Sequence, residues 1–434
     1  MMNNYTVVKR EKGWAVIREG ARRASSLHAT QAEALQKAEV LTRKPLRVSR
    51  SNSDDTAPLT GVKKHISMEV EKAKYYRALG ERIQNARKMR GGSLRSLAEK
   101  LEISHTTLQK YEKGLIPSDT AFICKLAKSL EVRTSYFLTP PKFTYTQVEW
   151  RKASKVGVKV QRQLEFEALD YFERYLQIEQ ILGIESQSFA PADFTQEKAE
   201  DIPEQIEAFT AKLRLDWGLG LNPLPNVHRM LEEQGVKVRI LPKSEGFDGL
   251  ASYLQGGANP VPVIALSDEY WAGDTIEDKD LPRFRFSALH ELGHLLMKLP
   301  EGIEHRVKEN LCHRFAAAFL FPKAQYFQSV GEKRRNLSNG EMLKLKAIWG
   351  MSIGAMMRRA CDLGVITQGA YKGYCIRNRS RKVEPQTWHG TEESKRFEGL
   401  VLRAYAEEMI SHSKAIDLLQ ISFGELAGKA ESLI

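Results

Sequence analysis

The feature that most constrains this 434-residue chain is the segment RFRFSALHELGHLLMKL, which spans residues 283–299. Its two histidines, His290 and His294, stand four residues apart, so on a helix they project from one face a single turn apart. That is the placement that two ligands of one tetrahedral zinc ion need. Glu291 stands beside them, where it can take a proton from metal-bound water and later deliver it to a leaving amine.

The leucines of the same segment would bury the remaining faces of the helix. The alternative interpretation is a core helix whose histidines are satisfied by ordinary side chains. We favour the metal site, because two imidazoles on a leucine-rich helix need polar partners that a metal ion supplies. The segment therefore predicts a zinc site with His290 and His294 as ligands and Glu291 as the catalytic base.

A catalytic zinc site needs a third protein ligand and one position left open for water. The downstream segment VKENLCHRFAAAFLFP is typical of a helix that ends near Pro322, and it contains Glu309, 15 residues after His294. Glu301 and Glu304 lie in the loop directly after the first helix and could also reach the metal. Geometry favours Glu309 modestly, because a helical position fixes the direction of its side chain.

The segments GLASYL, VPVIAL, LPRFRFSALHELGHLLM and ENLCHRFAAAFLFP resemble ImmA/IrrE-type zinc metallopeptidases in order and in spacing. A weaker likeness runs from about residue 145 to the end of the chain. The resemblance implies a zincin-like α+β domain, Zn²⁺ as cofactor and Glu309 as the third ligand. The chain departs from the family pattern at Cys312-His313, where Ala-Asn is usual. We expect His313 to bond Glu309 from outside the ligand set, with a direct metal or oxyanion role as the alternative.

The net charge of +12 is unevenly distributed. Residues 1–140 hold 27 Lys and Arg against 14 Asp and Glu, a net charge of +13, whereas the remaining 294 residues have a net charge of −1. A basic bias confined to one part of a chain indicates a polyanionic partner there, most plausibly nucleic acid. A merely solvated basic surface is the alternative.

Within this basic part, residues 78–138 predict five short helices. Gly91-Gly92 ends the first helix, and Ser93 and Ser104 are the expected N-caps of the second and third. The segment LRSLAEKLEISHTTLQKYEKGLIPSDTAFICKLAKSLEV resembles the Xre/Cro-type helix-turn-helix domain over about sixty residues.

In such a domain the second helix of the pair lies in the major groove, with its first residues at the base edges. The expected DNA contacts are therefore Arg95, on a phosphate, and His105, Thr106, Thr107, Gln109 and Lys110. The alternative is a helix-turn-helix that binds a partner protein.

The sequence predicts a multidomain, mainly α chain with α+β parts. Residues 1–50 form a β-β-α-β module, with strands at YTVVKR, GWAVIRE and LRVSR, and resemble a small bacterial family of unassigned function. The five-helix helix-turn-helix domain covers 76–140 and the metallopeptidase domain 191–330. The rest is a linker at 51–75, a helical connector at 141–190 whose apolar positions nearly encircle a helix, and a helical C-terminal region at 331–434. In that region we expect helices on either side of Gly350-Met351-Ser352 and final helices at 394–411 and 412–431.

No run approaches the roughly 18 apolar residues of a membrane span, and the four cysteines form no CxxC pair, so we expect a cytoplasmic protein without membrane partners. Together the resemblances imply a DNA-binding zinc endopeptidase that cleaves an Xre-type repressor and so switches on a stress, mobile-element or defence response. Its partners would be double-stranded DNA, the repressor and, as a homodimer, a second copy of the chain. The alternatives are a regulator whose peptidase-like half binds a partner without cleaving it, and a toxin–antitoxin component.

Overall fold

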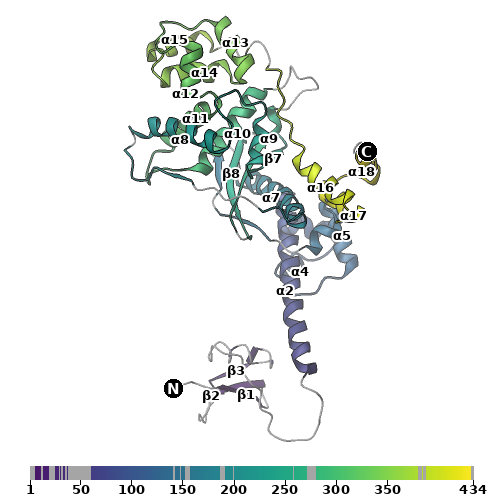
Figure 1. The fold of residues 1–434 in the computed structure, drawn as a ribbon. Coiled ribbons are helices and arrows are strands. Elements are labelled where there is room, and N and C mark those ends of the chain that lie inside the picture. Colours follow the sequence, from purple (N-terminus) through teal and green to yellow (C-terminus); the bar gives the residue numbers. More distant parts are fainter. Residues whose placement is uncertain are drawn as a thin grey trace. The chain divides into compact units, whose positions relative to one another are not determined.

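A computed structural model of the chain shows several packed parts joined along one polypeptide (Figure 1). It divides into two compact units, Met1–Ala78 and Leu79–Ile434, which are described separately. Most described residues are helical, as predicted for a multidomain, mainly α protein. No helix among them is both long and apolar enough to cross a membrane. The described residues are 5–10, 13–18, 25–28, 30, 33–34, 37, 60–139, 142–146, 148–151, 157–185, 191–198, 200–257, 259–270, 280–379, 384 and 388–431.

The first unit contains a three-stranded antiparallel sheet in the order β1-β2-β3. The predicted hairpin is present, with Tyr5 of β1 opposite Arg18 of β2. The third strand, however, lies at Ser26–His28, before the helical residues 33–34, and the strand expected at residues 46–50 lies outside the described residues. The strands are β1 (Tyr5–Arg10), β2 (Gly13–Arg18) and β3 (Ser26–His28).

Helix α2 (Thr60–Met89) crosses the boundary between the two units. The prediction of a linker at 51–75 was therefore wrong for its second half, and residues 51–59 lie outside the described residues. The helix could have been predicted, because residues 62–77 contain no proline and Val62, Ile66, Val70 and Ala73 recur at helical spacing among many polar residues.

The end of α2 and four further helices form the predicted five-helix domain. The N-caps are those expected from the sequence: the Ser93 hydroxyl accepts a bond from Ser96 N at 3.0 Å, and the Ser104 hydroxyl from Thr107 N at 3.0 Å. Leu97, Leu101 and Leu108 are buried in the core of the domain. The four helices are α3 (Leu94–Lys100), α4 (His105–Glu112), α5 (Thr120–Leu130) and α6 (Thr134–Leu138).

The connector contains helix α7 (Val158–Ile181), which is buried on two sides as its encircling apolar pattern predicted. Leu164, Phe172 and their neighbours pack on the sheet, whereas Tyr175 and Ile178 pack on the C-terminal helices. The expectation of a wholly helical connector was wrong, because strands β4 (Thr144–Tyr145) and β5 (Glu149–Arg151) precede α7 and pair with strand β8 (Gly249–Gln255) of the following domain.

The predicted metallopeptidase domain is built around a sheet in the order β4-β8-β9-β7, with β5 also paired to β8. Strand β8 is antiparallel to β9, and β7 is parallel to β9. Leu250 and Leu254 of β8 pack in the cluster that includes α7, whereas Ala251 packs with α10 on the other face. The three main strands are β7 (Lys237–Leu241), β8 (Gly249–Gln255) and β9 (Val261–Ser267), and the last two contain the segments GLASYL and VPVIAL.

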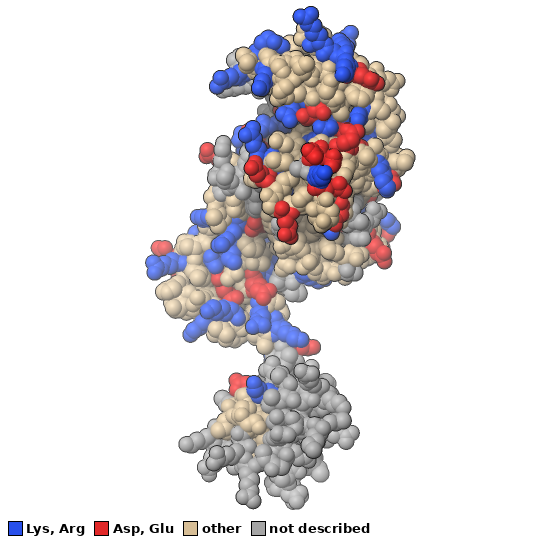
Figure 2. Space-filling model, turned by 90° about the vertical axis from the view of Figure 1, so that its left-hand side faces the viewer, with Lys and Arg blue, Asp and Glu red and all other residues tan. Residues whose placement is uncertain are grey.

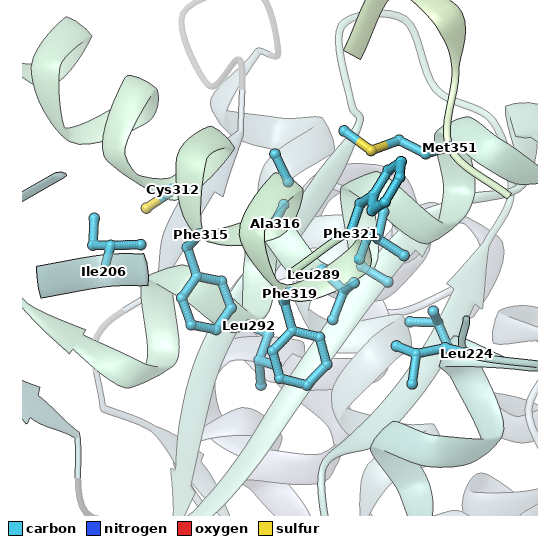
Figure 3. Close-up of a cluster of buried hydrophobic side chains, with 14 of the residues drawn as sticks. Ile206, Leu224, Leu289, Leu292, Cys312, Phe315, Ala316, Phe319, Phe321 and Met351 are labelled. Carbon is cyan, nitrogen blue, oxygen red and sulfur yellow. The ribbon is translucent and has the colours of Figure 1, made fainter. Parts of the chain in front are cut away.

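Helices on the second face of the sheet form the main core, where side chains of α10 and α11 interleave around Leu289, Leu292, Phe315 and Phe319 (Figure 3). Three methionines are buried in this core: Met351, Met356 and Met357. The elements of this part are β6 (Ala192–Asp193), α8 (Ile202–Asp216), α9 (Val227–Glu233), η2 (Asp268–Tyr270), α10 (Leu281–Leu296), β10 (Met297–Lys298), α11 (His305–Leu320), α12 (Lys323–Val330), α13 (Asn339–Trp349), α14 (Ile353–Asp362) and α15 (Gln368–Arg377).

The last part of the chain has three helices where two were expected, because Gln420 adopts a left-handed conformation (φ 59°) and ends α17. These helices pack on α7 through Phe397, Val401 and Leu418, whereas α13 and α14 belong to the main core. The region 331–434 therefore contributes to two different cores. The three helices are α16 (Arg396–Ala406), α17 (His412–Leu419) and α18 (Phe423–Glu431).

Charged residues are also unevenly distributed after residue 140. Residues 331–379 hold ten Lys and Arg against three Asp and Glu, although the sequence after residue 140 is nearly neutral overall. Figure 2 shows basic side chains over the helices at its top, where α13–α15 lie, and acidic side chains gathered below them. The exposed cations there include Lys333, Arg335, Lys344, Lys372 and Arg377.

Candidate metal centre and nucleic-acid interface

Helix α10 carries the HELGH segment through the inside of the peptidase part. Its N-cap is Asp280, whose carboxylate accepts a bond from Arg283 N at 3.3 Å, and Pro282 lies in the first turn, where a missing N–H costs nothing. Nearly every residue of the helix is buried, and both His290 and Glu291 have no exposed surface. The predicted ligands are therefore held by a fully packed helix.

Helix α11 packs closely against α10 because Gly293 stands between the two. A Cβ atom at Gly293 would lie 3.2 Å from the Phe315 ring, closer than ordinary van der Waals contact. The glycine of the motif thus lets α11 approach until Glu309 reaches both histidines. Its carboxylate oxygens lie 3.3 Å from His290 Nε2 and 3.3 Å from His294 Nε2, and the two Nε2 atoms are 3.1 Å apart.

His290, His294 and Glu309 therefore each offer one ligand atom within 4.8 Å of the others. In the described part of the chain they are the one group of histidine, cysteine and acidic residues with this geometry. Glu301 and Glu304, the alternatives considered for the third ligand, are exposed and do not join it. Two imidazoles and one carboxylate are a ligand set that Zn²⁺ takes in catalytic sites, so the residues present fit the metal.

The electrostatics of the three residues favour a cation between them. Burial by itself would raise the pKa of Glu309, but hydrogen bonds and charge from His290 and His294 bring its pKa well below the usual range. For His294 burial would lower the pKa, and the bonds to Cys312 and Glu309 instead raise the pKa to about 11. The groups that favour a proton here would also favour a metal ion, which must displace that proton to bind.

The sequence analysis assigned no role to Cys312. Its Sγ lies 3.5 Å from His294 Nδ1, the ring nitrogen that does not face Glu309. Ligand histidines usually have a partner on this second nitrogen, which fixes the ring's orientation. Cys312 lies three residues after Glu309, hence on the same face of α11, which is the one sequence signal that could have identified it. Burial raises the pKa of the Cys312 thiol.

His313 packs beside the site, with its ring centroid 4.4 Å from that of His290 and 5.8 Å from that of Phe286. His313 therefore lies next to a predicted zinc ligand, as the sequence indicated. Its hydrogen bond to Glu309 and its direct role at the metal or oxyanion both stay predictions. Glu291 faces the sheet instead: a Cβ atom at Gly249 would lie 3.0 Å from Glu291 Oε1. The first residue of β8 is therefore in contact with the predicted base.

The predicted DNA contacts lie at the start of α4 and on α3. Thr107 is half-buried, and its hydroxyl, like that of Thr106, lies 2.8 Å from Ser104 Oγ. Both hydroxyls are therefore engaged by the cap residue. The other five residues are exposed: Arg95, His105, Thr106, Gln109 and Lys110.

Helix α4 is fixed from behind by α2. Arg87 donates two bonds to the buried Glu112 carboxylate, at 2.6 and 2.9 Å. A Cβ atom at Gly80 would lie 2.5 Å from Glu112 O, so only glycine permits this approach of the two helices. The exposed face of α4 is therefore presented by a rigid support.

Three protein families match the chain. Residues 5–52 match a family described as an uncharacterized protein conserved in bacteria (DUF2188), and residues 83–137 match a helix-turn-helix family. Residues 231–360 match the IrrE N-terminal-like domain of peptidase family M78. None of the curated proteins matches the chain. The three matches confirm the resemblances found in the sequence, and the third includes the whole candidate metal centre.

The chain therefore joins a DUF2188 module and a helix-turn-helix domain to a domain that matches the IrrE-like M78 family, and these matches support a DNA-binding, protease-like regulator.

Proposed function

We propose that the chain is a cytoplasmic zinc endopeptidase that binds double-stranded DNA and cleaves a helix-turn-helix repressor, which switches on a stress, mobile-element or defence response. The observation that carries the proposal is the convergence of His290, His294 and Glu309 beside the buried Glu291. A domain that only bound a partner would need none of these four groups in this arrangement.

The residues divide the chemistry among them. Zn²⁺ held by His290, His294 and Glu309 would supply Lewis acidity at the scissile carbonyl. Glu291 takes the proton of the attacking water and later delivers it to the leaving amine. Cys312 holds the ring of His294 through its Nδ1 atom, so that Nε2 stays directed at the metal position.

The helix-turn-helix domain would bring the peptidase to its substrate. A repressor is concentrated at its operator, so a protease that binds the same DNA meets it at a high effective concentration. The exposed start of α4 and the net charge of +13 in residues 1–140 support DNA as the ligand of this domain.

The test is incubation of the zinc-loaded protein with helix-turn-helix repressors, beginning with any that an adjacent reading frame encodes. We expect one defined pair of fragments, which is lost with a chelator and in Glu291→Gln, a change that removes the base but keeps the side-chain size. Glu301→Gln, at an exposed carboxylate outside the metal group, is the matched control and should cleave normally. Stable binding of the repressor without cleavage would contradict the proposal and favour the regulator that only senses its partner.

A further inference from the structure

Strand β8 is bordered on one side by β9 and on the other by two very short strands of the connector. Thr144 and Tyr145 of β4 pair with the end of β8, and β5 pairs with its beginning. These connector strands are two and three residues long. Within the described part of the chain, β8 would be an open edge of the sheet without them.

The last residue of β5 pairs with a residue of β8 that contacts the predicted catalytic base. Arg151 is opposite Gly249 in the antiparallel register, and Trp150 is opposite Leu250. Gly249 is also the residue whose added Cβ would meet Glu291 Oε1 at 3.0 Å. A backbone that runs along the outer edge of β8 therefore passes a strand residue that contacts Glu291.

We propose that the outer edge of β8 is the binding site for an extended polypeptide substrate, and that β5 fills this site as an internal pseudosubstrate. An exposed edge strand binds an extended peptide through main-chain hydrogen bonds, which gives affinity without requiring a particular sequence. Three paired residues form a weak strand that a longer segment can displace. The inference rests on the proposed function, because it assigns the substrate's binding mode to the same centre.

The helix-turn-helix domain is tied to the start of this segment. Arg82 of α2 donates to Thr139 O at 2.7 Å and pairs with Glu173 of α7 at 2.6 Å. Glu173 in turn accepts a bond from Lys142 N at 3.2 Å, two residues before β4. A shift of α2 would therefore be transmitted to the segment that leads into β4 and β5. In this way a movement of the helix-turn-helix domain could change whether β5 stays paired with β8.

The experiment measures peptide binding in the zinc-loaded full chain that carries Glu291→Gln, so that the probe is not consumed. The probe is a fluorescent synthetic peptide with the sequence of residues 143–154, FTYTQVEWRKAS. The test variant adds Glu149→Pro and Trp150→Pro. Alternate residues of a strand face the same neighbour, so one of two consecutive prolines must remove a donor that bonds β8. The matched control carries Glu149→Val and Trp150→Val, which keep the strand's donors.

We expect the peptide to bind the proline variant at least tenfold more tightly than the valine control. In the absence of peptide, amides of residues 249–255 should exchange faster in the proline variant, and added peptide should restore their protection. If the proline variant does not fold, Trp150→Gly replaces it, because glycine keeps the N–H but weakens the strand. We then expect smaller increases in peptide affinity and in amide exchange.

Equal affinities in the proline and valine proteins, or no saturable binding to either, would overturn the inference. Because the assay uses a protein without its base, it does not depend on cleavage. A peptide that binds as expected, combined with a repressor that the unmodified protein never cuts, would support the β8 site and contradict the endopeptidase.

Discussion

The prediction that tests the metal centre most sharply concerns Cys312, which no family pattern marks as functional. In Cys312→Ala the bond between Sγ and His294 Nδ1, 3.5 Å long, is lost. The imidazole can then rotate, and its Nε2 atom is no longer held toward Glu309 and the metal. Removal of such an outer partner typically weakens metal binding by about 10–100-fold, which corresponds to about 1.4–2.7 kcal/mol.

The same substitution also acts on the core, and the two effects must be separated. Cys312 has no exposed surface and packs in the main hydrophobic cluster. Loss of one buried heavy atom should lower the free energy of unfolding of the metal-free protein by about 1 kcal/mol. Cys312→Ser keeps a hydrogen-bonding atom at the same place, so it should recover most of the metal affinity.

The assay is competition for Zn²⁺ with a chromogenic chelator, together with denaturant unfolding of the metal-free proteins. Cys375→Ala is the control, because that thiol is exposed on α15. If Cys312→Ala binds zinc as tightly as Cys375→Ala and differs only in unfolding, Cys312 merely fills space. Equal losses of affinity in the alanine and serine variants would likewise refute the hydrogen-bond argument.

Three further predictions concern the ligands, pH and DNA. Glu309→Gln should abolish stoichiometric zinc by metal analysis, and undiminished zinc would move the third ligand to another residue. His294, with its pKa raised from 6.5 to about 11, stabilises the metal-free protein fully below about pH 6.5 and loses this effect as pH rises toward 11. Zinc affinity should therefore rise with pH by about tenfold per unit in chelator competition, as expected when one proton is released, and a flat profile would contradict the assignment. In gel-shift titrations Gln109→Ala should cost about 1–3 kcal/mol on the preferred site alone, whereas Arg95→Ala should weaken binding to all sequences and reduce its salt dependence.

Much of the site was predictable because its parts are local. His290 and His294 share a helix face by their spacing alone, and Glu309 follows on the next helix after a short loop. The helix caps at Ser93 and Ser104 were predictable for the same reason, since a cap depends on residues three positions apart. Local rules therefore reached the ligands and the helix-turn-helix pair.

Other features depend on contacts between distant residues, and the sequence could not provide them. The residue opposite Arg151 is Gly249, about a hundred residues later, so the role of β5 depends on which strand it meets. The contact between Cys312 and His294 depends on how α11 is rotated against α10. Phe143 and Tyr145 are two residues apart, as on one face of a strand, but Val148 follows after three residues. This change of spacing breaks the alternation that would have predicted strands β4 and β5.

Helix α7 contacts the helix-turn-helix domain, the sheet and the C-terminal helices directly. Its Glu173 pairs with Arg82 of α2, and its Glu179 pairs with Lys237 of β7 at 2.8 Å and with Arg396 of α16 at 2.6 Å. The Glu179 and Lys237 side chains are 2% and 1% exposed. Buried pairs of this kind add little net stability, but removing one partner costs about 3–5 kcal/mol, so they favour one arrangement over its alternatives. A tether would only raise the local concentration of a substrate, whereas a fixed helix also sets the direction in which the metal centre faces relative to bound DNA. The rate of repressor cleavage would then depend on the distance along the DNA between the repressor's operator and the site bound by α4. A flexibly tethered peptidase would not show this dependence.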